Sequence, residues 1–326
     1  MRARFNGTVR ILLVVLVVLL GFSVLLGLNF FYRLDFIPAD AASGFHSPYY
    51  QYLSWSAARK ANRGEAIHVL VIPNNSGGVH DDPEVHRRFA LVQAFLGHLA
   101  FGDLDVLILV PAIPRTSQDW EVYTHALDLD VFTTTNPELH RPDLQLVSMI
   151  DDALERLTNS GWVVRPQVLL FGFSASGMFA NRFTLIHPDR VLAVSIGSPG
   201  GWPIAPVESW QGHALRYPVG VADLPYLLQR ELQTASYNRV PQLFWLGEND
   251  TNDSVPSRDG YAPEDAELVL SLFGQRPVDR WPIAAEIYRS VGANAVFHLY
   301  PNLAHRPSLR ALRDTRTLFR QAMGTD

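Results

Sequence analysis

The sequence predicts an α/β domain with a doubly wound, mostly parallel sheet, helices on both faces and a small insertion, preceded by one N-terminal transmembrane helix. Three observations carry this prediction. Short apolar runs alternate with helical stretches, one run enters a tight turn of small residues, and a long apolar segment lies near the N-terminus. With 326 residues, 48% of them hydrophobic, the chain is long enough to bury a sizeable core.

The composition excludes several classes of protein. A formal net charge of −5 argues against a nucleic-acid binder, which normally presents a basic face. The absence of cysteine excludes disulfides, thiolate metal sites and cysteine nucleophiles. No phosphate-binding glycine loop is present, so we expect no cofactor. Four residues resemble metal ligands but lie where a loop enters a helix, so capping and solvation explain them and no metal site is expected (His80, Asp81, Asp82 and His86).

The N-terminal segment has the length of a membrane span. Residues 11–31 contain only Ser23 and Asn29 as polar members, and as a helix they would extend about 31 Å, close to the thickness of a bilayer core. Three arginines and no acidic residue precede this segment (Arg2, Arg4 and Arg10). The positive-inside rule therefore places residues 1–10 in the cytoplasm and the remainder in the periplasm or outside the cell.

A cleaved signal peptide is the alternative for this segment. Its apolar region would be about 7–15 residues long with a small-residue cleavage site close behind. Here the apolar run is longer, and the only such site, Ala39-Asp40-Ala41, lies well beyond Phe31. The pattern favours an uncleaved signal anchor, followed by a linker over residues 32–44 and one domain over residues 45–326.

Six short, nearly continuous apolar runs are the main strand candidates: 68–73, 105–110, 167–171, 191–196, 242–246 and 295–300. Such runs are typical of parallel strands covered on both faces. Residues 49–55 are a further candidate, for an edge strand. Between the first two runs, five apolar residues at helical spacing predict an amphipathic helix (Val85, Phe89, Val92, Leu96 and Leu99). Asp82 is its expected cap and Pro83 its first-turn residue.

The most specific motif follows the run 167–171. It reads Gly172-Phe173-Ser174-Ala175-Ser176 and leads into a helical stretch. This is the G-x-S-x-G pattern with Ser176 in its last place. Small residues are needed there because the turn holds its serine in a strained conformation between strand and helix. The helix N-terminus favours developing negative charge, and the N–H of Ala175 can donate to an oxyanion. A structural serine-rich turn is the alternative.

With this motif the sequence resembles the α/β-hydrolase superfamily. The resemblance extends over nearly all of the chain after the linker. The resemblance implies a nucleophile, an acid and a histidine in that chain order. It assigns Ser174 as nucleophile, Asp250 in the loop after run 242–246 as the acid, and His305 after the last run as the base. Asp253 and, less favoured, Glu248 remain as alternative acids.

The resemblance also implies an oxyanion donor after the run 68–72. The family usually has His-Gly where this chain has Pro73-Asn74, so the resemblance does not fix which residue supplies this donor. The backbone N–H of Asn75 is favoured, with Asn74 or Ser76 as alternatives. An insertion over residues 199–240 would form a lid.

Two tryptophans of the insertion are candidates for the substrate pocket (Trp202 and Trp210). The aromatic content of the insertion suits an apolar acyl or aromatic substrate. In the alternative interpretation these rings pack the lid onto the core.

These assignments predict a membrane-anchored serine hydrolase of a small-molecule or polymeric carboxylic ester, without nucleic-acid partners. The motif is similar to those of polyester-depolymerase-like and feruloyl-type esterases. Two alternatives remain: an amidase or peptidase with the same residues, and a membrane-tethered, non-catalytic binding module.

Overall fold

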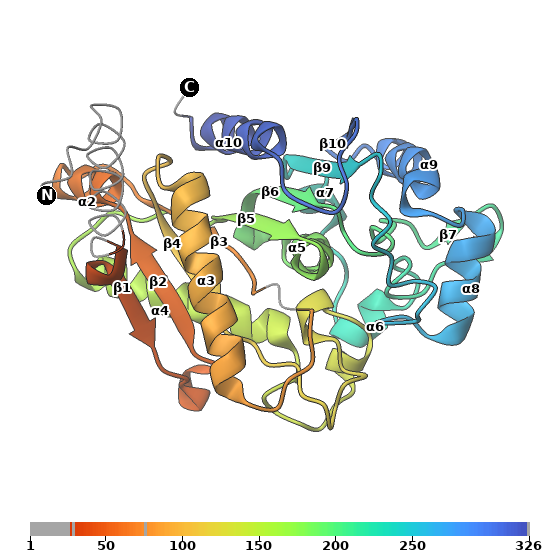
Figure 1. The fold of residues 1–326 in the computed structure, drawn as a ribbon, viewed down its shortest axis with the longest axis horizontal. Helices are drawn as coiled ribbons and strands as arrows, with labels where there is room; N and C mark the ends of the chain where they lie inside the picture. The colour runs from red at the N-terminus through yellow and green to blue at the C-terminus, as the bar shows by residue number, and fades with distance from the viewer. Residues whose placement is uncertain (1–26, 28–29, 75–76, 325–326) are drawn as a thin grey trace, which may run out of the picture.

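The computed structural model describes residue 27 and residues 30–74 and 77–324, which contain an eight-stranded sheet (Figure 1). The strands are β1 Leu34–Ile37, β2 Tyr49–Leu53, β3 His68–Val71, β4 Val106–Pro111, β5 Val168–Phe173, β6 Val191–Gly197, β9 Gln242–Gly247 and β10 Ala295–Tyr300. Their spatial order is β1-β2-β4-β3-β5-β6-β9-β10. β2 is antiparallel to both of its neighbours and all other pairs are parallel, which confirms the predicted mostly parallel sheet.

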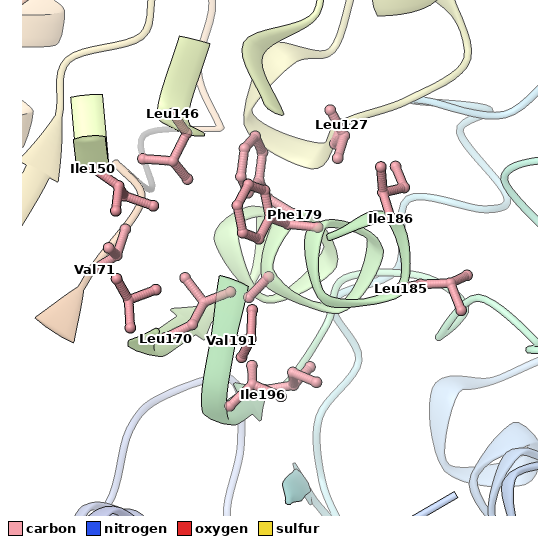
Figure 2. Packing of buried hydrophobic residues seen from close by; sticks show 14 of the residues in the cluster. Val71, Leu127, Leu146, Ile150, Leu170, Phe179, Leu185, Ile186, Val191 and Ile196 are labelled. Carbon is pink, nitrogen blue, oxygen red and sulfur yellow. The ribbon is translucent and has the colours of Figure 1, made fainter. Parts of the chain in front are cut away.

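Helices cover both faces of this sheet. The helices of the described chain are α2 Trp55–Asn62, α3 Pro83–Phe101, α4 Pro142–Asn159, α5 Ala175–Ile186, α6 Leu224–Leu228, α7 Thr234–Tyr237, α8 Pro263–Leu272, α9 Pro277–Ser290 and α10 Leu309–Met323. α3 and α10 pack on one face, whereas α4, α5 and α9 contribute to the core on the other. Figure 2 shows part of this second core, in which Leu146 and Ile150 of α4 lie near Val71 and Leu170 of the sheet. The doubly wound arrangement agrees with the prediction.

All six predicted apolar runs form strands, but the assignment of the edge was wrong. Residues 49–53 form β2, which lies between β1 and β4 rather than at the edge. The edge strand next to β2 is β1, which lies inside the segment interpreted as a linker, and β10 forms the other edge. Residues before β1 also belong to the domain, since Phe30 is fully buried and stacks on Tyr52 with ring centroids 5.0 Å apart. A four-residue strand is too short for its alternation to be recognised, and only pairing with β2 reveals it.

The helix predicted after β3 is present as α3, with Asp82 as its N-cap and Pro83 in its first turn. However, the expected inward stripe faces outward. Phe89, Val92, Leu96 and Leu99 are 47–54% exposed, and a stripe of mostly smaller residues packs inward instead (His86, Ala90, Ala94, Gly97 and Phe101). These small side chains let the helix approach the sheet closely, and a Cβ at Gly97 would lie 2.6 Å from Ile72. Close approach therefore decided which face is buried.

The predicted membrane segment, residues 11–31, lies almost entirely outside the described residues. Among the helices that the structure does describe, none combines the length and apolarity needed to cross a membrane.

Candidate active site

The strand–turn–helix elbow forms as the motif predicts, between β5 and α5. Ser174 occupies the turn with φ 60° and ψ −126°, a backbone conformation that residues other than glycine rarely adopt. It is also the N-cap of α5, but its side chain makes no capping hydrogen bond. Its backbone N–H instead donates to Gly197 of β6 at 2.9 Å. The turn thus holds the hydroxyl of Ser174 away from the helix and available to other groups.

Ser176, in the last position of the motif, ties the elbow together. Its Oγ donates to the carbonyl of Phe173 at 2.9 Å and accepts the Phe173 N–H at 3.0 Å. A glycine in this position would lack these two bonds, so the serine substitution stabilises the turn rather than breaking the pattern.

Gly172→Ala is expected to disrupt the elbow. A Cβ at Gly172 would lie 2.0 Å from the backbone oxygen of Ser176, a distance that forces the backbone to move. We expect a lower melting temperature together with loss of the Ser174 geometry, measured by thermal unfolding and by the rate of covalent labelling of Ser174. A variant with unchanged stability and labelling would contradict this account of the turn.

A row of hydrogen bonds joins Ser174, His305 and Asp250. Ser174 Oγ lies 2.9 Å from Nε2 of His305, and Nδ1 of His305 lies 2.9 and 3.1 Å from the two carboxylate oxygens of Asp250. With the proton on Nδ1, the imidazole donates to Asp250 and its Nε2 can accept the Ser174 proton. Asp250 is 3% exposed, and its Oδ1 also accepts the backbone N–H of Asn252 at 2.9 Å. The three elements β5, β9 and β10 each end at this edge of the sheet, so parallel pairing brings the residues together.

The alternative acids have other partners. Asp253 forms a two-pronged ion pair with Arg280, with both N–O distances 2.9 Å, and Arg280 is almost fully buried. Glu248 accepts the backbone N–H of Asn302 at 3.2 Å. Of the three candidates, Asp250 is therefore the one that contacts His305 in the structure.

The predicted oxyanion donors are described only in part. Ala175 is the first residue of α5, so its N–H has no partner within the helix and lies beside Ser174. Asn75 and Ser76 lie outside the described residues. Asn74 is buried, and its side-chain amide donates to the carbonyl of Ile113 at 2.8 Å, which holds the start of the loop. Gly77 ends the loop close to the elbow, since a Cβ there would lie 4.0 Å from that of Ala175.

A small cavity of about 320 Å³ opens beside Ser174. Its lining is mostly polar and comes from the elbow and from the loops after β3, β4, β6 and β9: Gly77, Tyr123, Ser174, Ala175, Met178, Gly200, Asn252, Asp253, Ser254, Ser257 and Asp259. The expected apolar pocket is therefore not what adjoins the nucleophile.

Trp202 and Trp210, the predicted pocket residues, do not line this cavity. Trp202 is buried and stacks on Phe273 with ring centroids 3.9 Å apart, while its indole N–H donates to the carbonyl of Val219 at 2.9 Å. Trp210 lies in a two-stranded hairpin of the insertion, β7 Ser209–Trp210 with β8 His213–Ala214. Burial against Phe273 makes Trp202 part of the core, as the alternative interpretation held.

Sequence reasoning missed Arg115, which supports the cavity wall. Arg115 is 3% exposed; it donates to the carbonyl of Gly77 at 2.8 Å and forms an ion pair with Asp259. Its guanidinium also lies over the Tyr123 ring, 3.6 Å from the centroid. One arginine thus connects the loop after β3 to two residues of the cavity. Its position shortly after β4 was the available signal, because the carboxyl ends of parallel strands meet at one edge.

Asp128 is a second residue that the sequence did not single out. It is buried behind Tyr123, whose N–H donates to it at 3.0 Å, and its Oδ1 has no hydrogen-bond partner among the described residues. Burial raises the pKa of Asp128 to about 7, despite Arg182 and Arg115 nearby. Its ordinary pKa in an unfolded chain is about 3.9.

Asp128→Asn is expected to change how stability depends on pH. A group whose pKa is higher in the folded protein than in the unfolded chain stabilises the fold fully at pH values below its unfolded pKa. This stabilisation is lost as the pH rises through the folded pKa. Between pH 5.5 and 8.5 the free energy of unfolding of the wild type should therefore fall by on the order of 2 kcal/mol relative to that of the variant. Urea unfolding at both pH values measures this, with the exposed Asp35→Asn as a charge control. A stability difference between variant and wild type that does not vary with pH would contradict it.

Comparison with known proteins gives similarity in structure only. No protein-family model matches the sequence, and no curated protein matches it either. Among solved structures, poly(aspartic acid) hydrolase-1 from Sphingomonas sp. KT-1 is 17% identical, with 85% of this chain and 95% of that chain covered and a TM-score of 0.56. The poly(3-hydroxybutyrate) depolymerase LpqC from Bordetella parapertussis is also 17% identical, with 88% and 86% covered and a TM-score of 0.50. At these identities the likeness shows a shared fold.

Proposed function

We propose that this protein, which has the α/β-hydrolase fold, is a serine hydrolase that cleaves a carboxylic ester through an acyl-enzyme intermediate. The observation that supports the proposal is the hydrogen-bonded row from Ser174 through His305 to Asp250, with 2.9 Å between Ser174 Oγ and His305 Nε2. A serine hydroxyl in a strained turn, within reach of an imidazole that a buried carboxylate orients, is the arrangement that activates a nucleophile.

In the proposed first step, Ser174 Oγ adds to the ester carbonyl while Nε2 of His305 takes its proton. Asp250 holds the proton on Nδ1 and stabilises the imidazolium that forms. The N–H of Ala175 donates to the oxyanion, and the N–H of Asn75 is the proposed second donor. His305 then returns the proton to the departing alcohol. In the second step, water adds to the acyl carbonyl while His305 takes a proton from it. The bond to Ser174 Oγ then breaks, and His305 returns the proton to Ser174, which releases the acid and restores the enzyme.

The cavity supports a substrate with a short, polar acyl group. Its volume is about 320 Å³ and its walls include Asn252, Ser254 and Ser257. The two carboxylates of the wall, Asp253 and Asp259, are each paired with a buried arginine, so the wall is polar without an uncompensated charge. A long aliphatic chain would leave these polar groups desolvated and unpaired.

We therefore expect a preference among p-nitrophenyl esters. Acetate and hydroxybutyrate esters should be cleaved with kcat/KM at least about ten-fold above the octanoate ester, since one desolvated polar group costs about 1–3 kcal/mol. Oligomers of 3-hydroxybutyrate and of aspartic acid, the units named for the two structural neighbours, belong in the same assay. A preference for octanoate would contradict the assignment of this cavity to the acyl group.

Fluorophosphonate labelling of the full chain tests the proposed function. We expect the label on Ser174, located by peptide mass spectrometry, and no label in Ser174→Ala. Ser257→Ala is the matched control, because Ser257 also lines the cavity but makes no contact with His305 among the interactions described. Ester turnover with no turnover of aminoacyl amides favours the esterase, and the reverse favours the peptidase alternative. A folded chain that neither labels nor turns over either class would favour the non-catalytic binding module.

We also propose that the apolar segment predicted at residues 11–31 anchors the protein in a membrane through its part before Phe30, because Phe30 itself is buried in the domain. The hydrolase domain then lies in the periplasm or outside the cell. The support is the apolar run of the sequence and the arginines before it. The chain should remain with membranes after alkaline carbonate extraction, and protease added outside should reach the domain. Release into the supernatant would contradict the anchor.

A further inference from the structure

The hydrolase domain begins without a flexible spacer after the apolar N-terminal segment. This segment ends at Phe31 in the sequence, and β1 begins at Leu34. Phe30 is already fully buried in the domain, with its ring centroid 5.2 Å from that of Phe95 in α3. Two intervening residues can span only about 7 Å even when extended. If the segment crosses a bilayer, as proposed above, the domain must lie directly on the bilayer surface.

The helix on which Phe30 packs presents an apolar face to its surroundings. Phe89, Val92, Leu96 and Leu99 of α3 are each about half exposed. Beyond them, a groove of about 350 Å³ between α3 and α10 is lined largely by apolar side chains, including Leu96, Leu99 and Leu309. Leu309 is 85% exposed. Phe31 and Tyr32, next to Phe30, are also exposed. These exposed apolar side chains lie on α3, at the start of α10 and just before β1. Exposed apolar side chains grouped in this way mark an interaction surface.

The same two helices carry positive charge in a chain that is acidic as a whole. α3 and α10 contain six arginines and two acidic residues, a net charge of +4, whereas the entire chain carries −5. The arginines are Arg87, Arg88, Arg310, Arg313, Arg316 and Arg320. Apolar side chains flanked by arginine are the composition of helices that lie in the interface of an anionic bilayer.

We propose that the face formed by α3 and α10, called here the α3/α10 face, lies on the surface of an anionic bilayer. The apolar residues of α3 then enter the headgroup layer, and the exposed Arg310 and Arg313 of α10 contact lipid phosphates. Arg316 and Arg320 are bonded within the domain, to the carbonyl of Ala100 and to Asp103. This inference rests on the proposed membrane anchor and is independent of the catalytic chemistry. It identifies which side of the hydrolase domain faces the lipid.

The experiment uses the absence of native cysteine, which permits labelling of the full chain at one chosen position. Leu96→Cys carries an environment-sensitive NBD fluorophore on the α3/α10 face. Leu144→Cys is the matched control, because Leu144 is a leucine of similar exposure, 45% against 50%, on α4 at the opposite face of the sheet. Both are reconstituted in nanodiscs of phosphatidylcholine and phosphatidylglycerol, with and without phospholipid that carries a nitroxide near the headgroup.

We expect the nitroxide lipid to quench NBD at position 96 at least about three-fold more than at position 144, and quenching at 96 to fall when phosphatidylglycerol is omitted. Equal quenching at the two positions would overturn the proposal. So would a blue-shifted signal at position 96 without lipid quenching, which would mean that the N-terminal segment or a second copy covers α3. Fluorophosphonate labelling of the same samples reports on Ser174 separately, so failure of this proposal and failure of the hydrolase assignment are distinguishable.

Discussion

Ser174→Ala is expected to lower kcat for ester hydrolysis by on the order of 10⁶, the largest effect of any single substitution that we predict. The reason is that the proposed reaction requires a covalent bond to Ser174 Oγ, and no other hydroxyl contacts His305 in the described structure. Residual activity would come from the oxyanion donors and substrate binding alone. Steady-state kinetics on a p-nitrophenyl ester measures the change.

The fold of this variant should be retained. Ser174 makes its backbone bonds through its N–H and carbonyl, which alanine preserves, and its side chain caps no helix. Thermal unfolding and circular dichroism of Ser174→Ala and wild type should therefore agree closely. A folded variant that keeps more than a small fraction of wild-type activity would show that the nucleophile is another residue.

Asp250→Asn and Asp253→Asn are expected to have opposite consequences. Asp250→Asn removes the carboxylate that holds the His305 tautomer and should lower kcat by on the order of 10⁴. Asp253→Asn leaves the hydrogen bonds between Ser174, His305 and Asp250 intact but breaks the ion pair with the buried Arg280. Removing one partner of such a pair costs about 3–5 kcal/mol of unfolding free energy. We therefore expect lost activity with a stable fold in the first variant and lost stability with retained chemistry in the second.

The two variants serve as controls for each other, since each changes one carboxylate to an amide in the same loop. Measuring kcat and urea unfolding on both separates the two effects. A larger loss of kcat in folded Asp253→Asn than in Asp250→Asn would move the acid to Asp253.

Local patterns in the sequence were sufficient for six strands of the sheet and for the elbow. Continuous apolar runs mark strands covered on both faces, and all six form the parallel part of the sheet. The turn at Ser174 requires small residues around it wherever it occurs, so the motif could be read without knowledge of the contacts. Asp82 and Pro83 likewise mark the start of α3 through interactions within a few residues.

Other features depended on contacts between distant parts of the chain. Helical spacing alone indicated a face of α3 but not that the small residues Ala90, Ala94 and Gly97 would pack inward. The strand β1 exists only through its pairing with β2. From the sequence, Trp202 could equally line a pocket or pack in the core. In the structure it stacks on Phe273 and belongs to the core.

By itself, the sequence determined the apolar runs and the elbow serine, because each depends on neighbours within a few positions. The order of the site residues along the chain came from the resemblance to the α/β-hydrolase superfamily. Only the tertiary structure decided which acid contacts the histidine, since Asp250 and His305 are 55 residues apart and Ser174 and His305 are 131 apart. Such contacts depend on where parallel strands end together at one edge of the sheet. The packing of whole elements sets that arrangement, which no local pattern encodes.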